Sequence, residues 1–187
     1  MSKTYFEDQT FDQPTEVAPG QYEQCTFTAG RLAGADLGDR LFIDCTFVDC
    51  DLTNAKLAET GLQNVTFERC KLLGLAFDDC RDFLFAVTFA GCNLELATFR
   101  EWKLKGATFK ECQLTEVDFT GADLREASFD DCDLNRATFE RTDLRSADFR
   151  TAYAYRFSPE ENRLKGARFA VEGLPGLLVE YGVVIDG

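Results

Sequence analysis

A five-residue repeat dominates this sequence, with Leu or Phe at 25 positions spaced five apart in two registers. The first register comprises Phe27, Leu32, Leu37, Phe42, Phe47, Leu52, Leu57, Leu62, Phe67, Leu72 and Phe77, and the second comprises Leu84, Phe89, Leu94, Phe99, Leu104, Phe109, Leu114, Phe119, Leu124, Phe129, Leu134, Phe139, Leu144 and Phe149. Side chains of a strand alternate between its two faces, and five is an odd number, so one straight strand cannot bury them all. The chain must therefore turn once in every repeat.

Identical residues line up when the sequence is compared at a spacing of twenty, which is four repeats. The two purest columns, our predicted core ladders, are Phe47, Phe67, Phe89, Phe109 and Phe129, and Leu52, Leu72, Leu94, Leu114 and Leu134. Four short strands per coil, with coils stacked at about 4.8 Å, would place each column inside one tube. The sequence thus predicts an all-β, quadrilateral β-helix of about seven coils over residues 20–150. A fold of this kind usually provides a binding surface and not a reaction centre.

Both ends depart from the repeat. We expect residues 1–19 to form an N-terminal cap, because Pro14 and the run Ala18-Pro19-Gly20 interrupt the spacing. We expect residues 151–187 to contain final repeats, a capping helix and a tail. Apolar residues recur there at helical spacing, namely Leu174, Leu177, Leu178 and Tyr181, followed by Val183 and Ile185. A solenoid end exposes its core and its backbone edge, so a helical lid is predicted.

Eight cysteines precede repeat positions by two residues, the slot otherwise filled mainly by Ala. They are Cys25, Cys45, Cys50, Cys70, Cys80, Cys92, Cys112 and Cys132. A free thiol packs as a small hydrophobe, and stacked coils hold neighbouring Cβ atoms in parallel. The pattern favours buried thiols over disulfides, zinc ligands or redox centres.

Catalysis is poorly supported by the sequence. The chain has no histidine, which removes the Ser-His and Cys-His dyads and the commonest metal ligand. Its carboxylates recur with the repeat, which is typical of a solvated face, and no phosphate-binding glycine motif occurs. We therefore predict a protein that is not an enzyme, with no catalytic, metal-binding or cofactor-binding residues and no cofactor.

The net charge of −13 opposes binding to nucleic acid or to an anionic membrane. The acids are concentrated toward the N-terminus, since residues 1–83 carry 15 acidic and 7 basic side chains. One interpretation is that a basic groove made for DNA attracts this rod; the other is that the acidity only maintains solubility. No run of 18 apolar residues and no apolar leader occurs, so a cytoplasmic location is expected.

One interruption breaks the central repeat, because residues 78–83 contain two more residues than the spacing allows. This bulge brings Arg81, Asp82, Phe83 and Phe85 out of the regular pattern. It either presents these side chains to a partner or is a neutral insertion absorbed at a corner. We therefore regard these four residues as candidates for partner binding.

Trp102 is the fifth candidate. It occupies a slot that holds Ala or Cys in most repeats, and an indole is too large for the inner corner of a square coil. The corner either opens and exposes the ring as a contact anchor or accommodates it by packing.

Two tandem units, Ala122-Asp123-Leu124-Arg125-Glu126 and Thr142-Asp143-Leu144-Arg145-Ser146, resemble the A(D/N)LXX consensus of pentapeptide-repeat proteins. The known fold of that family is a right-handed quadrilateral β-helix. The C-terminal segments 147–153, 162–169 and 176–185 resemble the end of the Qnr-type quinolone-resistance proteins. Because those proteins bind DNA gyrase and topoisomerase IV, the resemblance implies a DNA mimic that protects a type II topoisomerase from quinolones or toxins.

The same resemblance implies a homodimer joined end to end through the C-terminal cap. Its candidate interface residues are Leu174, Leu177, Leu178, Tyr181, Val183 and Ile185. From the residues alone a simple cap is the alternative. For function, the alternative is a structural or interaction solenoid that has an unrelated protein partner and no topoisomerase activity.

Overall fold

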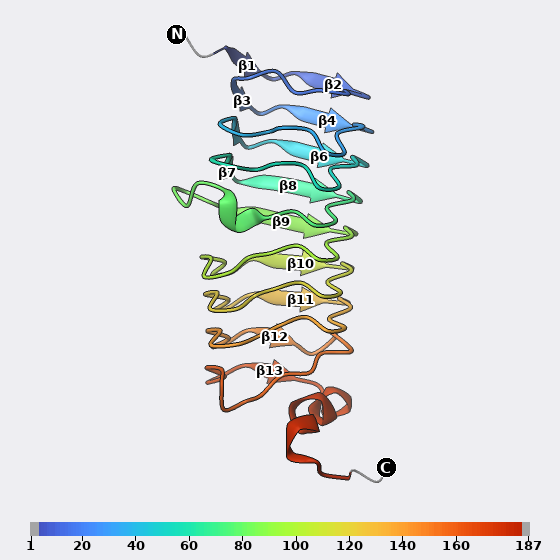
Figure 1. The fold of residues 1–187 in the computed structure, drawn as a ribbon, viewed down its shortest axis with the longest axis vertical. Coiled ribbons are helices and arrows are strands. Elements are labelled where there is room, and N and C mark those ends of the chain that lie inside the picture. Colours follow the sequence, from blue (N-terminus) through green and yellow to red (C-terminus); the bar gives the residue numbers. More distant parts are fainter. Residues whose placement is uncertain (1–3, 185–187) are drawn as a thin grey trace.

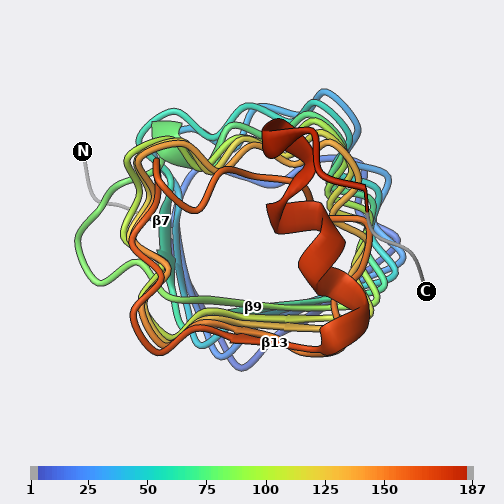
Figure 2. The same cartoon turned by 90° about the horizontal axis from the view of Figure 1, so that it is seen from below.

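The computed structural model, which describes residues 4–184, is a rod of stacked coils with four sides (Figures 1 and 2). One side, the long-sheet side, carries nine parallel strands. These are β2 (Thr10–Asp12), β4 (Thr26–Thr28), β6 (Thr46–Val48), β8 (Val65–Glu68), β9 (Val87–Ala90), β10 (Thr108–Lys110), β11 (Ser128–Asp130), β12 (Asp148–Phe149) and β13 (Arg168–Phe169). Each strand pairs with its equivalent in the next coil, so the predicted quadrilateral β-helix is confirmed.

A second side, the short-sheet side, carries four parallel strands. They are β1 (Tyr5–Glu7), β3 (Gln21–Glu23), β5 (Leu41–Ile43) and β7 (Gly61–Gln63). Beyond β7 this side continues as single-residue bridges, from Lys103 to Asp123, from Asp123 to Asp143 and from Asp143 to Arg163. The two remaining sides are also built from such bridges.

The Phe and Leu columns form the core. Phe47 stacks on Phe67 with ring centroids 5.2 Å apart, and Phe109 stacks on Phe129 at the same separation. Every residue of the two predicted ladders is buried, with at most 3% of its surface exposed. These residues are Phe47, Phe67, Phe89, Phe109, Phe129, Leu52, Leu72, Leu94, Leu114 and Leu134. Each such side chain contributes about 1.5–3 kcal/mol on burial, which lets a narrow rod fold without a helical layer.

All eight thiols are buried, as predicted. The Cys50 thiol donates to the carbonyl oxygen of Phe27 at 3.4 Å, and the Cys70 thiol donates to Phe47 at 3.4 Å. Desolvation raises the pKa of the Cys45 thiol to about 11. The cysteine slot therefore supplies weak donors that tie one coil to the coil before it.

The periodic acids have a structural task at the turns. The carboxylate of Asp118 accepts the N–H of Thr120 at 2.8 Å, and that of Asp123 accepts the N–H of Arg125 at 3.3 Å. An acid in this position satisfies a turn N–H that the coil-to-coil ladder does not use. The repeat of Asp before the central residue thus stabilises each corner.

Residues at the N-terminus form a further level of the rod. β1 pairs with β3 and β2 pairs with β4, with a spacing of 16 residues in place of 20. Phe6 stacks on Tyr22 at 4.6 Å. This level brings the solenoid to about eight turns, where seven were expected.

The interruption lies between Arg81 and Ala86. The N–H of Arg81 still bonds to the carbonyl of Thr60, in the regular register, whereas the N–H of Ala86 bonds to Leu62. The inserted residues form an outward loop above β10 (Figure 1). The prediction that Leu84 opens the second core register was wrong, because Leu84 is 63% exposed and Phe85 packs against the core in its place.

Short 3-10 helices close the C-terminal end. Val171–Leu177 and Val179–Tyr181, labelled η2 and η3, cross the open end of the last coil (Figure 2). Leu177 is buried, and the backbone of Gly176 lies directly against the carbonyl of Tyr155. A short helical cap is therefore confirmed. Within residues 4–184 none of the helices has the length and apolar character needed to cross a bilayer.

Candidate interaction surface

The loop after η1 (Phe77–Asp79) is anchored by charged side chains on both flanks. The Arg81 guanidinium lies 3.2 Å from the Asp39 carboxylate and 3.6 Å from the Glu59 carboxylate. On the other flank, the Lys103 ammonium lies 3.0 Å from the carboxylate of Asp82. These pairs hold the loop base across four coil levels.

The loop tip is apolar and open to solvent. Phe83 is 69% exposed and Leu84 is 63% exposed. The side-chain amide of Gln63 donates to the carbonyl of Phe83 at 3.5 Å, which restrains the backbone beneath the ring. An aromatic ring held by a fixed backbone is the kind of group that serves as an anchor at protein interfaces.

Two candidates do not project into solvent. Phe85 meets Trp102 edge to face with ring centroids 5.4 Å apart, and both rings are only partly exposed and pack against the core. The corner accommodates the indole by packing because Phe85 replaces the regular Leu above it. The indole Nε1 of Trp102 is buried and has no hydrogen-bond acceptor among residues 4–184.

Four carboxylates form a column beside this loop, and we call it the acidic corner. Its residues are Asp39, Glu59, Asp79 and Glu101, all of them exposed. Three of them turn the chain through the left-handed region, with φ of 61° at Asp39, 57° at Glu59 and 56° at Glu101. Backbone bonds join the levels, from the N–H of Glu59 to the carbonyl of Asp79 for example. Parallel strand spacing sets these acids about 4.8 Å apart along the rod.

The short-sheet side has the opposite character in its C-terminal half. Six basic residues and three acidic residues face outward from its lower levels, namely Lys103, Lys105, Arg125, Arg145, Arg163 and Lys165 against Asp123, Glu126 and Asp143. Arg125 binds Asp123 through two hydrogen bonds of 2.7 and 2.6 Å. That guanidinium lowers the pKa of the Asp123 carboxyl. Charge on this rod is therefore separated by side and by level.

The structure brings together around one loop all five residues predicted for partner binding, namely Arg81, Asp82, Phe83, Phe85 and Trp102. The sequence did not identify Asp39 and Glu59 as partners of Arg81, because they lie 42 and 22 residues away along the chain. The coil period of 20 residues was the available signal, since it places residues 39 and 59 in the column above Asp79.

The arrangement suits binding. No group of three or more His, Cys, Asp or Glu side chains within residues 4–184 is placed to hold a metal ion. The acidic corner consists of single carboxylates separated by a full coil. Charge and an exposed aromatic ring are what this surface offers to another molecule.

The cap residues predicted for the dimer interface are placed unequally. Leu177 is buried, while Leu174 is 41%, Leu178 38%, Tyr181 48% and Val183 53% exposed. Ile185 lies outside the described residues. The cap thus covers the core with one side chain and presents an apolar outer surface.

Solved structures with similar folds include a trypsin-treated variant of QnrB1, described as a plasmid-mediated fluoroquinolone resistance protein. It is 17% identical, covers 98% of each chain and has a TM-score of 0.44. HetL, a pentapeptide repeat protein involved in heterocyst differentiation regulation in Nostoc sp. strain PCC 7120, is 20% identical over 91% of this chain and 86% of its own, with a TM-score of 0.43. A pentapeptide repeat protein from the Arabidopsis thaliana thylakoid lumen is 25% identical over 65% of this chain and 70% of its own, with a TM-score of 0.20.

No curated protein matches the sequence at a significant level. The family model of the pentapeptide repeat region matches residues 21–81 and 83–154, and the single residue left between the two matches is Asp82 in the loop. Those residues are the same stacked coils that bury the Phe and Leu columns. The chain belongs to the pentapeptide-repeat family.

Proposed function

We propose that this protein binds a type II topoisomerase, DNA gyrase or topoisomerase IV, as an acidic rod that occupies a basic groove made for DNA. The observation that carries the proposal is the acidic corner, whose four carboxylates follow the long axis of the rod. The resemblance of the C-terminal segments to Qnr-type proteins supports the choice of partner. The proposed role is binding and not catalysis, and the proposed location is the cytoplasm.

Regular spacing lets the corner substitute for a phosphate strand. Phosphates of one DNA strand follow one another at about 3.4 Å along the helix axis, and acids on successive coils are separated by about 4.8 Å. A groove lined with Lys and Arg attracts either polyanion by the same long-range field. The exposed ring of Phe83 lies beside this column and supplies an apolar contact that DNA lacks.

The test is a supercoiling assay with purified gyrase, with and without ciprofloxacin, titrated with this protein. We expect a dose-dependent change in supercoiling or in its inhibition by the drug. The informative variant neutralises the corner through Asp39→Asn, Glu59→Gln, Asp79→Asn and Glu101→Gln. Electrostatic mimicry predicts that this variant needs a higher dose.

A control with the same change in net charge separates position from total charge. It neutralises four exposed acids of the long-sheet side, Asp12→Asn, Glu111→Gln, Asp130→Asn and Asp131→Asn. We expect it to follow the wild-type dose curve. Equal curves for both variants would reject mimicry by the corner, and Phe83→Ala tests the loop contact separately.

We propose further that the cap joins two copies end to end. Its outer surface carries Leu174, Leu178, Tyr181 and Val183, which remain largely exposed in one chain. Burying them against a second cap would remove this apolar surface from water. Sedimentation equilibrium at micromolar concentration tests it, and Tyr181→Asp should convert a dimer into single chains; a one-chain mass for the wild type rejects the dimer.

The second candidate function is an interaction solenoid with an unrelated protein partner. The observation that favours it is the basic half of the short-sheet side, which a DNA mimic does not require. In that case gyrase activity would not respond to the protein at any dose. Pull-down with the intact chain would then recover a different protein, and Phe83→Ala would weaken that capture.

A further inference from the structure

The coil ladder is broken at one place on the short-sheet side. Above the break, the N–H of Ala86 bonds to the carbonyl of Leu62, so the loop level is tied to β7. Below the break, the N–H of Leu104 bonds to the carbonyl of Asp123, so Lys103–Lys105 is tied to the next coil. Among residues 4–184 no backbone hydrogen bond joins these two levels on the short-sheet side.

The break leaves a short open strand edge. In an extended segment the N–H and C=O groups of residues i and i+2 point the same way. The N–H and C=O of Lys103 and the C=O of Lys105 therefore point toward the loop level. The opposite ends of the same peptide groups, the C=O of Trp102 and the N–H groups of Leu104 and Gly106, bond to the coil below. None of these groups has a backbone partner within residues 4–184. Their counterparts one coil lower, the N–H and C=O of Asp123 and the C=O of Arg125, are bonded to the coil above them.

A hollow of about 180 Å³ lies at this edge. Its lining includes Phe85, Ala86 and Val87 from the loop level and Lys103 and Lys105 from the edge. The N–H of Phe85, which would otherwise face the edge, bonds to the carbonyl of Asp82 at 3.4 Å. The insertion has thus separated the two levels on this side and left backbone polar groups without backbone partners beside an open hollow.

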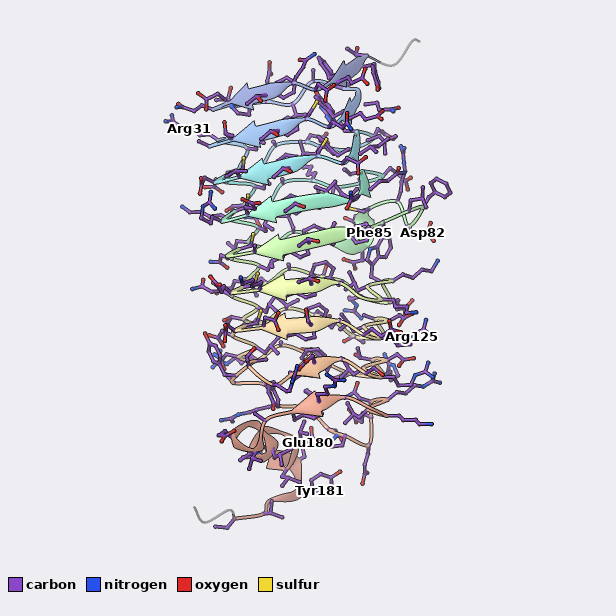
Figure 3. All side chains as sticks on the ribbon, turned by 180° about the vertical axis from the view of Figure 1, so that it is seen from behind. Arg31, Asp82, Phe85, Arg125, Glu180 and Tyr181 are labelled. Atoms are coloured by element: carbon purple, nitrogen blue, oxygen red, sulfur yellow. The ribbon has the colours of Figure 1, made fainter. Side chains whose placement is uncertain are left out.

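Basic side chains continue from this hollow along the rod. Lys105, Arg125, Arg145 and Lys165 hold equivalent positions on successive coils, and Lys103 lies beside the first of them. Figure 3 shows Arg125 projecting from the same side of the rod as Asp82 and Phe85. In a chain with a net charge of −13, this is a local surplus of positive charge. Duplex DNA does not fit the hollow, and the remainder of the rod repels it.

We propose that the hollow binds an extended acidic segment of a partner protein. The segment's backbone pairs with the open edge at Lys103 and Lys105, as in the addition of a strand to a sheet. Its carboxylates meet the ammonium groups of the same two residues and the guanidinium of Arg125, in competition with Asp82, Glu126 and Asp123, which pair with these groups in the unbound chain. The site is independent of topoisomerase binding, and its test needs no topoisomerase.

The experiment measures binding of a fluorescent peptide, acetyl-Glu-Val-Glu-Val-Glu-amide, to the full chain by anisotropy. The peptide acetyl-Lys-Val-Lys-Val-Lys-amide is the comparison ligand. We expect saturable binding of the acidic peptide only, weakening with added salt. In ¹⁵N spectra of the full chain, the amide resonances of Lys103 and Lys105 should shift on addition of the acidic peptide.

Two variants assign the binding to this site. Lys103→Glu with Lys105→Glu should lower the affinity for the acidic peptide by about tenfold or more, which corresponds to the loss of one strong contact. Ala86→Phe fills the mouth of the hollow without altering charge. It should lower the affinity for the acidic peptide by about fivefold. The matched control, Lys56→Glu with Lys71→Glu, alters the net charge by the same amount on other sides of the rod. Its affinity for the acidic peptide should stay within about twofold of the wild-type value.

Three results would overturn the proposal. The first is equal affinity for the acidic and basic peptides. The second is an Ala86→Phe variant that binds the acidic peptide with wild-type affinity, which would mean that charge alone attracts the peptide. The third is a set of amide shifts that leaves Lys103 and Lys105 unmoved while peptide is bound.

Discussion

The hydroxyl of Thr142 donates a hydrogen bond of 2.9 Å to the carbonyl oxygen of Phe119, which lies 23 residues earlier in the chain. Thr60 makes the same bond to Leu37 at 2.8 Å. The thiol of Cys50 makes it to Phe27 at 3.4 Å. Threonine and cysteine are thus equivalent at this slot because each brings a small donor to the previous coil.

This equivalence predicts the effect of substitutions at Thr142. Thr142→Val keeps the shape and removes the donor, so we expect a loss of about 1 kcal/mol in the free energy of unfolding. Thr142→Cys retains a donor and should lose less. Urea denaturation of both variants measures the difference, and equal losses would show that the bond has no role.

Truncation of a core ring should be far more damaging than truncation of the loop ring. Phe109 is fully buried between Phe89 and Phe129, so Phe109→Ala should cost about 3–5 kcal/mol. Phe83 is 69% exposed, and Phe83→Ala should change stability by about 0.5 kcal/mol or less. Urea midpoints decide this, and a large loss for Phe83→Ala would contradict the exposed loop tip.

The carboxyl of Asp143 should contribute to stability only above acidic pH. Its hydrogen bonds with the Arg145 side chain hold the pKa below the ordinary value of 3.8. A group with a lowered folded-state pKa stabilises the protein above its unfolded pKa, and this contribution is lost as the pH falls through the folded value.

Asp143→Asn keeps an acceptor for the turn N–H and removes the charge. We expect the wild type to exceed this variant in urea midpoint at pH 6, with the difference shrinking below about pH 4. The pair is partly exposed, so the difference should also shrink with added salt. A difference that stays constant from pH 6 to pH 3 would contradict the assigned ion pair.

Thiol chemistry provides a test of the core that requires no mutation. All eight cysteines are buried, and desolvation raises the pKa of Cys45 and of Cys80. A buried thiol that remains protonated reacts slowly with disulfide reagents. We expect negligible labelling by a chromogenic disulfide in native buffer and labelling of eight thiols per chain in denaturant. Rapid labelling of the native protein would contradict the buried column.

The C-terminal cap depends on the absence of a side chain at Gly176. A Cβ atom there would lie 2.1 Å from the carbonyl oxygen of Tyr155, a backbone atom that cannot move aside easily. Gly176→Ala should therefore undock the cap and cost about 1–3 kcal/mol. Hydrogen exchange over 171–181 should become faster, whereas Val184→Ala, at an exposed site, should leave it unchanged.

The core was predictable from the sequence because its signal is repeated. A residue such as Phe109 is supported by identical residues one coil above and one coil below, so an error at one position would disturb a whole column. Leu84 also has leucines one coil above and one coil below, Leu62 and Leu104, but it lies next to the insertion. The insertion could be placed before or after it, and the spacing alone favoured Leu84, while the structure packs the larger Phe85 against Trp102 and the core.

The candidate surface was predictable only in outline. An irregularity in the repeat marked Arg81 and Phe83, but the partners of Arg81 depend on how a corner turns in three dimensions. The open edge at Lys103 could not be predicted, because hydrogen bonds lost at an insertion depend on how the extra length is distributed between levels.

The uninterrupted nine-stranded sheet and the interrupted side next to it give the rod unequal stiffness. Every level of the long-sheet side is bonded to the next, from β2 to β13, whereas the short-sheet side has a seam above Lys103. Flexing that widens or narrows the seam strains few bonds, while flexing in the perpendicular direction strains the ladders of intact sides. A partner that binds both halves of the rod would therefore contact a protein that bends most easily at the Phe83 loop.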